Sequence, residues 1–387
     1  MSIEALVDIS RYYGSNSDYV NAGGGNTSFK DKETLYVKSS GTSLAEAVPE
    51  TFVGMDRKAL GRILEKAYPA ESAAREKAVL ADLMAARKAG MEQKRPSVET
   101  LLHDLLPFSY VVHTHPALVN GLTCSQQGET AMNKLFGREA IWIPSTNPGY
   151  ILSIKVKKAM EDYTAKEGRP ASIIFLQNHG VFVGSDSIEG IKNTYRDIEK
   201  KIEGHIKKRP DFSGESRTGP GRLSSVLAEL AGGKAAFLCN REISRLVKDT
   251  ASFYPVSSAF SPDHIVYAGS DPLFFGTGKP GAFAETGFQE ASLQEASLQE
   301  ASLQKAWKNH VAKTGMAPKI AAIQGLGVYG LGASEKAADL ALVLFLDAVK
   351  VSVFSDSFGG PLFMSRDQIN FINGWEVEAY RSKAVMG

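Results

Sequence analysis

Residues 171–184, ASIIFLQNHGVFVG, determine the fold class predicted for this chain. Two apolar runs flank the polar tetrapeptide QNHG, a pattern typical of two strands joined by a tight turn. The SDS motif that follows is a good helix start, so a capped helix is predicted to run to about residue 208. His179 lies in the turn, where its side chain stands at a strand end while the backbone reverses.

Strands and helices alternate through the rest of the first half. Residues 34–41 read as a strand, and Ser97 is a suitable N-cap for a helix over residues 97–106, whose apolar residues recur at helical spacing. Further helices are predicted over residues 1–13, 56–94 and 152–166. This alternation predicts an α/β fold.

A second copy of the opening pattern lies further along the chain. Residues 318–351 repeat its order of Pro, apolar strand, Gln, Gly-Val-aromatic and Ser-capped helix, with Leu326 in the position of His179. Residues 265–274 likewise echo residues 141–150. The chain therefore reads as an active half followed by a degenerate partial copy.

The domain boundary is predicted from one linker. Residues 209–221, RPDFSGESRTGPG, are dense in Pro, Gly and Ser. We therefore expect a catalytic domain over residues 1–210 and a smaller α/β domain over residues 222–387. Within the second domain, a five-residue motif repeats through residues 289–304. So short a period matches no solenoid, and we interpret it as an exposed helical or mobile insertion.

Composition and charge exclude several classes of protein. The chain has 387 residues, 43% hydrophobic and 22% charged, which is an ordinary globular composition. Its formal net charge of +1 gives no global field to recruit nucleic acid or an anionic membrane. No window approaches the roughly 20 apolar residues of a membrane span, and no signal peptide is evident. Two cysteines fit a reducing compartment, so we expect a cytoplasmic protein.

Two histidines lie close together in residues 109–122, SYVVHTHPALVNGL. In a strand, residues i and i+2 point to the same face, so His113 and His115 would direct two imidazoles at one spot. Together with His179 they make a three-histidine set that leaves a fourth position open, as catalytic zinc sites do. The alternative is that these histidines stand at strand ends and hydrogen-bond to loops.

One carboxylate is a candidate partner of the histidines. Glu99 falls in the first turn of the predicted 97–106 helix, where an acid also interacts favourably with the helix dipole. That interaction is the alternative explanation for Glu99. His103 lies four residues later on the same helix face, and we interpret it as a supporting or packing residue.

Two glycine-rich turns are candidate anion sites. GGGNTS (23–28) and KSSGT (38–42) can expose backbone N–H groups and hydroxyls, with Ser97 at a helix start as a third contributor. Either turn alone is a weak signal, because most glycine-rich turns are only turns.

GGGNTS, SSGT, PSVET, HTHP and LQNHG occur in this order, and together they resemble the class II aldolase/adducin family. The similarity is closest to the aldolase half of bifunctional rhamnulose-1-phosphate aldolase/alcohol dehydrogenase proteins. The resemblance implies a central β-sheet covered by helices on both sides. It also implies zinc-dependent cleavage of a ketose 1-phosphate, such as rhamnulose 1-phosphate, to dihydroxyacetone phosphate and an aldehyde, in a homo-oligomer that is often a tetramer.

The resemblance also assigns roles to individual residues. It implies zinc ligation by His113, His115 and His179, with Glu99 as the acid/base carboxylate. The implied phosphate- or substrate-binding residues are Gly25, Asn26, Ser40, Gly41 and Ser97. The chemistry agrees with this set, because breaking a carbon–carbon bond beside a ketone leaves negative charge that a Lewis acid stabilises, and a nearby carboxylate can move the proton on carbon.

Other functions remain open at this point. The same metal chemistry supports a sugar-phosphate epimerase or dehydratase. GLGVYG (325–330) satisfies the G-x-G-x-x-G pattern of NAD-binding dehydrogenases, although apolar residues intervene before the Ser334 helix start. A non-enzymatic scaffold is the other alternative, since a fold does not fix a function.

Overall fold

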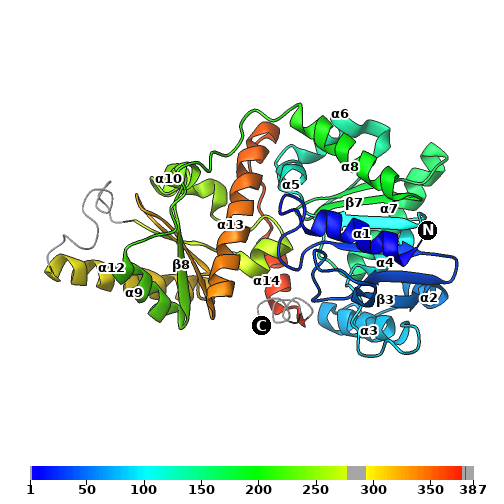
Figure 1. Ribbon diagram of the computed structural model, residues 1–387, viewed down its shortest axis with the longest axis horizontal. Coiled ribbons are helices and arrows are strands. Elements are labelled where there is room, and N and C mark those ends of the chain that lie inside the picture. The colour runs from blue at the N-terminus through cyan, green and yellow to red at the C-terminus, as the bar shows by residue number, and fades with distance from the viewer. Residues whose placement is uncertain (1, 277–292, 377–379, 381–387) are drawn as a thin grey trace. The chain divides into compact units, whose positions relative to one another are not determined.

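The computed structural model describes residues 2–276, 293–376 and 380 (Figure 1). Two compact units divide the chain. Of the described residues, the first unit contains those up to Ile206 and those from Ser357 on, and the second contains those between Lys207 and Asp356. Each unit has its own sheet and its own hydrophobic core.

The described residues from Ser357 on belong to the first unit, whereas the linker at residues 209–221 predicts that residues 222–387 all belong to the second domain. The backbone of Phe358 accepts a hydrogen bond of 2.9 Å from the Gln127 N–H, and Leu362 O accepts one of 2.7 Å from Asn178 Nδ2. Both hydrogen bonds end on backbone oxygens, which carry no sequence signature. The boundary predicted from the linker therefore does not show that the chain returns to the first unit.

The first unit is built on a seven-stranded sheet with the order β3-β2-β1-β4-β7-β6-β5. Neighbouring strands are antiparallel except β5 and β6, which are parallel. The strands are β1 (Asn26–Lys30), β2 (Thr34–Lys38), β3 (Phe52–Asp56), β4 (Tyr110–Thr114), β5 (Ile141–Ile143), β6 (Ile173–Leu176) and β7 (Gly180–Ser185). The strand that carries His113 is thus the middle one of the seven.

Helices cover both faces of this sheet, so the expected fold class is confirmed (Figure 1). Successive strand residues point to opposite faces. Val112 accordingly packs in one core cluster, and Val111 packs in another on the opposite face. The helices on the Val112 side are α1 (Ile3–Gly14), α5 (Ala117–Thr123), α6 (Gly128–Phe136) and α8 (Ile188–Glu203). Those on the other side are α2 (Arg57–Glu65), α3 (Ser72–Ala85), α4 (Thr100–Leu105) and α7 (Tyr150–Glu167), and α14 (Arg366–Gly374) follows the second unit.

Two of the expected helices differ from the structure. Residues 56–94 contain α2, started by the Asp56 side chain as expected, then a break and α3, and the chain beyond Ala86 is not helical. The helix expected over residues 97–106 is shorter, because α4 begins at Thr100 with Glu99 as its N-cap residue. Ser97 is therefore not the cap.

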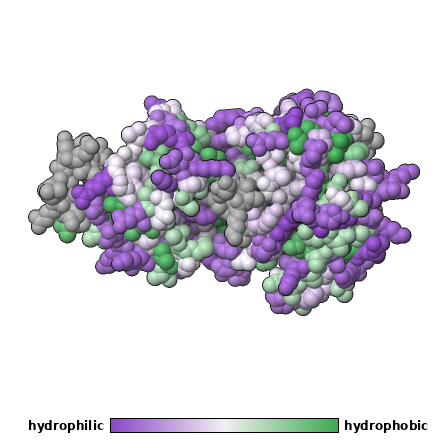
Figure 2. Space-filling model, turned by 60° about the horizontal axis from the view of Figure 1, so that its bottom comes forward, coloured by the Kyte–Doolittle hydropathy of each residue, from purple (hydrophilic) through white to green (hydrophobic). Residues whose placement is uncertain are grey.

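The described surface carries no extended apolar patch on the face drawn in Figure 2, where hydrophobic residues are scattered among hydrophilic ones. None of the helices in the described ranges combines the length and the apolar composition needed to cross a lipid bilayer.

The second unit contains a four-stranded sheet with the order β8-β11-β10-β9. Its strands are β8 (Lys234–Leu238), β9 (Leu273–Phe275), β10 (Ile320–Ile323) and β11 (Gly327–Gly332), and its helices are α9 (Gly221–Ala231), α10 (Arg241–Leu246), α11 (Thr250–Phe253), α12 (Leu293–Thr314) and α13 (Glu335–Ser355). The pentapeptide repeat is helical from Leu293 on, whereas its residues 289–292 lie outside the described residues. Leu303 is buried and Leu298 is 64% exposed, so this helix contributes one face to the core.

Strand pairing shows that the second unit repeats part of the first. β8-β11-β10-β9 matches β4-β7-β6-β5 in strand order and in every strand direction. His113 faces Phe182 across the β4–β7 ladder, and Phe237 faces Tyr329 at the matching place in the β8–β11 ladder. The turns also correspond, since Asn178 and Gly325 both adopt positive φ, at 58° and 73°.

The shared register identifies the residues of the second unit that occupy the positions equivalent to the three histidines. Phe237 replaces His113, Cys239 replaces His115 and Leu326 replaces His179, the last as the sequence predicted. The echo expected between residues 265–274 and 141–150 is wrong, because residues 264–268 form a π-helical turn and β9 takes the place of β5.

The GLGVYG stretch does not form a dinucleotide-binding loop. Such a loop leads from a strand directly into a helix, whereas Gly325 and Leu326 here turn the chain into an antiparallel strand. A side chain at Gly330 would lie 2.2 Å from Ala338 O, so close packing of β11 on α13 accounts for this glycine. The dehydrogenase alternative thereby loses its structural basis in this stretch.

Candidate active site

Three histidines converge at one end of the first sheet. His113 is the fourth residue of β4, His115 follows that strand, and His179 lies in the turn between β6 and β7. Asn178 makes the turn possible: its φ of 58° is the left-handed conformation that Asn tolerates best among residues with a side chain. Its N–H donates to Thr123 O at 3.1 Å, which fixes the turn against the end of α5.

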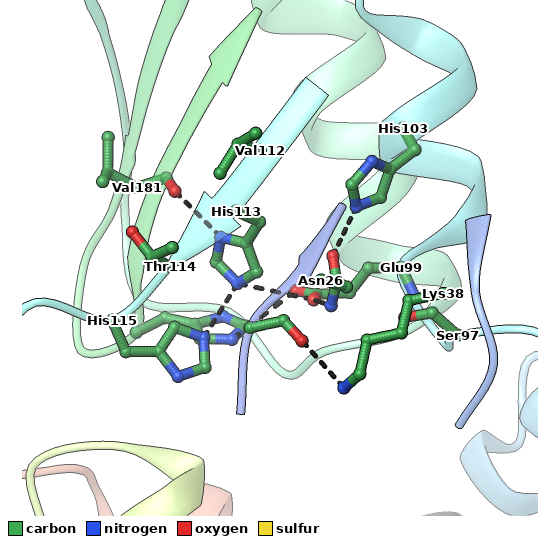
Figure 3. A network of polar contacts seen from close by, with 12 residues as sticks. Asn26, Lys38, Ser97, Glu99, His103, Val112, His113, Thr114, His115 and Val181 are labelled. Carbon is green, nitrogen blue, oxygen red and sulfur yellow. Dashed lines mark hydrogen bonds and ion pairs between the residues drawn. The ribbon is translucent and has the colours of Figure 1, made fainter. Parts of the chain in front are cut away.

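The three imidazoles are close enough to share one ion. One ring nitrogen from each residue lies within 4.8 Å of the others. His113 Nε2 and His115 Nε2 are 2.9 Å apart (Figure 3). Two ligands of a tetrahedral Zn²⁺ with bonds of about 2.0–2.1 Å are separated by about 3.3 Å. The cluster thus needs shifts of the order of an ångström, within reach of side-chain rotation, to bind a metal.

His113 is oriented by its surroundings. Its Nδ1–H donates to Val181 O at 3.0 Å, and its ring stacks on Phe182 with centroids 4.0 Å apart. A hydrogen bond of this kind fixes the tautomer, so Nε2 keeps its lone pair and faces the cluster. His113 is fully buried, whereas His115 is partly exposed and gives the cluster its open side.

Glu99 faces the same cluster. Its Oε2 lies 3.4 Å from His113 Nε2, and its Oε1 lies 3.5 Å from His179 Nε2. Oε1 is buried and has no hydrogen-bond partner in the described part of the chain. The side chain makes no capping hydrogen bond to α4, although Glu99 is the N-cap residue. A simple helix-dipole role therefore does not account for its orientation.

A buried network supports Glu99 from behind (Figure 3). Asn26 Nδ2 donates to Glu99 Oε2 at 2.6 Å, and Asn26 Oδ1 contacts His103 Nε2. The His103 side chain is fully buried, and burial holds its pKa well below the usual range, so the ring is neutral. The sequence placed His103 near the site without showing its partners. It also did not foresee that the Asn26 amide would contact Glu99.

The two glycine-rich turns lie beside this network. An isolated bridge joins Ser39 to Pro96, which brings the 38–42 turn against the segment that carries Ser97. Gly25 and Gly41 adopt φ of 64° and 84°, and a side chain at Gly25 would lie 2.9 Å from His113 O. Glycine at position 25 thus permits the close approach of the first turn to β4.

Hydrogen bonds already hold several of the predicted anion-binding groups. The N–H of Ser40 donates to Arg95 O at 2.8 Å, and the N–H of Ser97 donates to Lys38 O at 3.2 Å. Ser97 Oγ accepts a hydrogen bond of 3.2 Å from the Glu99 N–H. These bonds order the turns and leave hydroxyls, rather than those two N–H groups, for a ligand.

Lys38 is a further candidate site residue, which the sequence motifs did not single out. It is 4% exposed, and its Nζ donates to Gly23 O and Gly25 O at 3.1 Å each. The available signal was a lysine at the end of an apolar strand, directly before Ser-Ser-Gly. A buried ammonium of this kind places positive charge at the base of the first turn.

A family model described as the class II aldolase and adducin N-terminal domain matches residues 4–203, just over half of the chain. The chain belongs to the class II aldolase/adducin family. The uncharacterised oxidoreductase YuxG of Bacillus subtilis (strain 168) is 27% identical over 217 residues, which are 54% of this chain but 30% of that protein. The present chain thus spans less than a third of the length of that relative.

Two solved structures each resemble about half of the chain. The N-terminal class II aldolase domain of a conserved protein from Thermoplasma acidophilum is 26% identical, with a TM-score of 0.46, and the match covers 54% of this chain and 94% of that one. An L-fuculose 1-phosphate aldolase is 18% identical, with a TM-score of 0.37, and the match covers 53% and 86%.

Proposed function

We propose that this class II aldolase/adducin family member is a zinc-dependent aldolase that cleaves a ketose 1-phosphate to dihydroxyacetone phosphate and an aldehyde. The observation that supports this most strongly is the convergence of three imidazoles on one point beside a buried carboxylate oxygen that lacks a hydrogen-bond partner. Rhamnulose 1-phosphate is our first candidate substrate.

The donor set fits a divalent transition metal. Three neutral imidazole nitrogens with an open side are the ligands of catalytic zinc sites, and the Val181 hydrogen bond already orients His113 as a ligand. We assign ligation to His113, His115 and His179. A bound Zn²⁺ would stabilise the negative charge that develops on the substrate oxygens beside the cleaved bond.

Glu99 is assigned the proton transfer. Its Oε2 is held by Asn26, whereas Oε1 is the oxygen available to take a proton from, or return it to, the substrate carbon. The distances of 3.4 and 3.5 Å to the His113 and His179 nitrogens put this carboxylate beside the proposed metal position.

The substrate's phosphate is assigned to the glycine-rich turns. Gly25, Ser40, Gly41 and Ser97 border this region, and Lys38 adds a cation at its base. Binding the non-reacting end of the substrate there would fix the position of the reacting carbon, so remote binding energy supports the chemistry. Asn26 belongs to this set through its backbone position, since its side chain is engaged with Glu99.

Catalysis is assigned to the first unit and a structural role to the second. Phe237 and Leu326 pack in the apolar core at the positions equivalent to His113 and His179, and neither can ligate a metal. We also propose that the chain assembles as a homo-oligomer.

The experiment is to incubate the zinc-loaded chain with a panel of ketose 1-phosphates and to detect dihydroxyacetone phosphate with a coupled reductase. Release with one or more ketoses is expected. Conversion without release, to an epimer or a dehydrated product, would instead indicate epimerase or dehydratase chemistry at the same site. No turnover of any sugar phosphate by protein with full metal content would refute the aldolase assignment.

A further inference from the structure

We propose that His103 and Ser28 are positioning residues for Glu99, because together they fix which end of the Asn26 amide faces that carboxylate. The inference rests on the proposed role of Glu99 in proton transfer. It concerns a chain of four side chains, none of which is more than 7% exposed. The three other than Glu99, namely Asn26, His103 and Ser28, are not members of the three-histidine cluster, although Asn26 is paired with His113 in the β1–β4 ladder.

The contacts form one continuous line. Glu99 Oε2 receives the Asn26 Nδ2 hydrogen bond of 2.6 Å, Asn26 Oδ1 contacts His103 Nε2, and His103 Nδ1 lies 2.7 Å from Ser28 Oγ. β1 supplies Asn26 and Ser28, which point to the same face because they are two residues apart. Glu99 is the N-cap residue of α4, and His103 lies in the last turn of that helix.

The carboxylate determines the direction of every hydrogen bond in this line. An ionised carboxylate only accepts, so Asn26 must present its NH₂ group, and its carbonyl must then accept from His103 Nε2–H. The other ring nitrogen, Nδ1, carries no proton and accepts from the Ser28 hydroxyl. A neutral ring is required, which agrees with the pKa of His103 held well below its usual range by burial.

With His103 as donor, both ends of the Asn26 amide are fixed, whereas without it Glu99 alone opposes a flip of the amide. A flipped amide would place Oδ1 against Glu99 Oε2, and two acceptors facing each other would push the carboxylate out of position. Small displacements of a catalytic group reduce turnover strongly, while the metal, held by three histidines, is unaffected. These hydrogen bonds thus hold Glu99 so that Oε1, which has no hydrogen-bond partner in the described part of the chain, faces the proposed reaction centre.

The first test is neutron diffraction of the zinc-loaded full chain, which locates hydrogen atoms directly. We expect a proton on His103 Nε2, none on Nδ1, and the NH₂ group of Asn26 facing Glu99. A proton on Nδ1, or an Asn26 amide with its carbonyl facing Glu99, would overturn the inference. This test needs no substrate, so it decides the inference even if the proposed function fails.

The second test compares His103→Leu with His103→Gln in the exchange of a carbon-bound proton of dihydroxyacetone phosphate with solvent deuterium. Leu removes the donor, whereas the Gln amide can still donate to Asn26 Oδ1. His103→Leu should lower the maximal exchange rate by about 10- to 100-fold, with zinc content and the KM of dihydroxyacetone phosphate nearly unchanged. His103→Gln should recover most of the rate.

Two outcomes would overturn the positioning role. One is wild-type exchange in a His103→Leu protein that retains zinc, and the other is an equal loss in the Gln variant when it is as stable as the wild type. If His103→Leu does not fold, Ser28→Ala replaces it, because removing the hydroxyl frees the ring to change tautomer, and a smaller loss of exchange is expected. Unchanged exchange in a folded Ser28→Ala protein would count against the inference. Absence of exchange in the wild type would refute the proposed function instead.

Discussion

Replacing Glu99 with Gln tests the proposed mechanism most directly. The substitution keeps the size of the side chain and removes its charge and its ability to accept a proton. Because Asn26 Nδ2 donates to the Oε2 position at 2.6 Å, the new amide should place its carbonyl oxygen there. Its NH₂ group then occupies the Oε1 position beside His179, where a proton acceptor is needed.

The magnitude follows from what the substitution removes. General acid/base catalysis is worth about 10²- to 10⁴-fold, so turnover should fall by that factor, which is about 2.7–5.4 kcal/mol of barrier. Zinc content should stay near one per chain, because three imidazoles hold the ion. The KM should change little, because the turns assigned to the phosphate are not touched.

The assay measures deuterium exchange at the carbon of dihydroxyacetone phosphate by proton NMR, with zinc measured by mass spectrometry on the same samples. Glu76→Gln is the matched control, because Glu76 is another buried carboxylate of the first unit, bonded to the Tyr150 N–H and to Arg75. It should leave exchange unaltered. If Glu99→Gln loses the metal, Glu99 is chiefly a ligand; if it changes neither rate nor metal, another group moves the proton.

Two further predictions rest on the described residues, and a third rests on the resemblance to the family. His179→Ala should abolish both zinc binding and activity. Leu326→Ala, at the equivalent position of the second unit, should leave zinc content unchanged. Full zinc content in His179→Ala would show that His179 is not a metal ligand. Burial lowers the pKa of Lys30 from 10.5 to about 7, so the unfolded state binds more protons between these values. The free energy of unfolding should therefore rise with pH from about 7 to 10, by at most about 1.4 kcal/mol per unit, and urea titrations of Lys30→Met should lack this component. Sedimentation should show an assembly larger than a monomer, and a monomer at working concentration would contradict the proposed oligomer.

The fold could be predicted from sequence wherever a local pattern determines it. The strand pair around Asn178 and the helix capped by Ser187 were both expected, because turn residues and capping residues act within a few positions. The long helix expected over residues 56–94 failed for the opposite reason. The chain beyond Ala86 is held by tertiary contacts, such as the Lys88 N–H donating to Gly54 O at 2.8 Å, which override helix propensity.

The candidate site, too, can be predicted from sequence where a local spacing determines it, and cannot where it depends on tertiary contacts. The i, i+2 spacing of His113 and His115 indicated one face of a strand, and the structure brings His179 to the same point from a second strand end. What periodicity could not show is how groups far apart in sequence meet. Asn26 and Glu99 are 73 positions apart, and their hydrogen bond depends on β1 lying next to β4 and under α4.

The second unit shows that the backbone alone does not make this site. It preserves the strand order, the ladder register and the positive-φ turn of the first unit, yet Phe237 and Leu326 fill the equivalent positions and join an apolar core. The described part of the second unit also lacks a counterpart of β1, the strand that places Asn26 behind Glu99. For the proposed function, metal ligation and the support of the carboxylate are thus separate requirements. The first depends on three side chains, and the second depends on the additional strands that the first sheet has beyond β4.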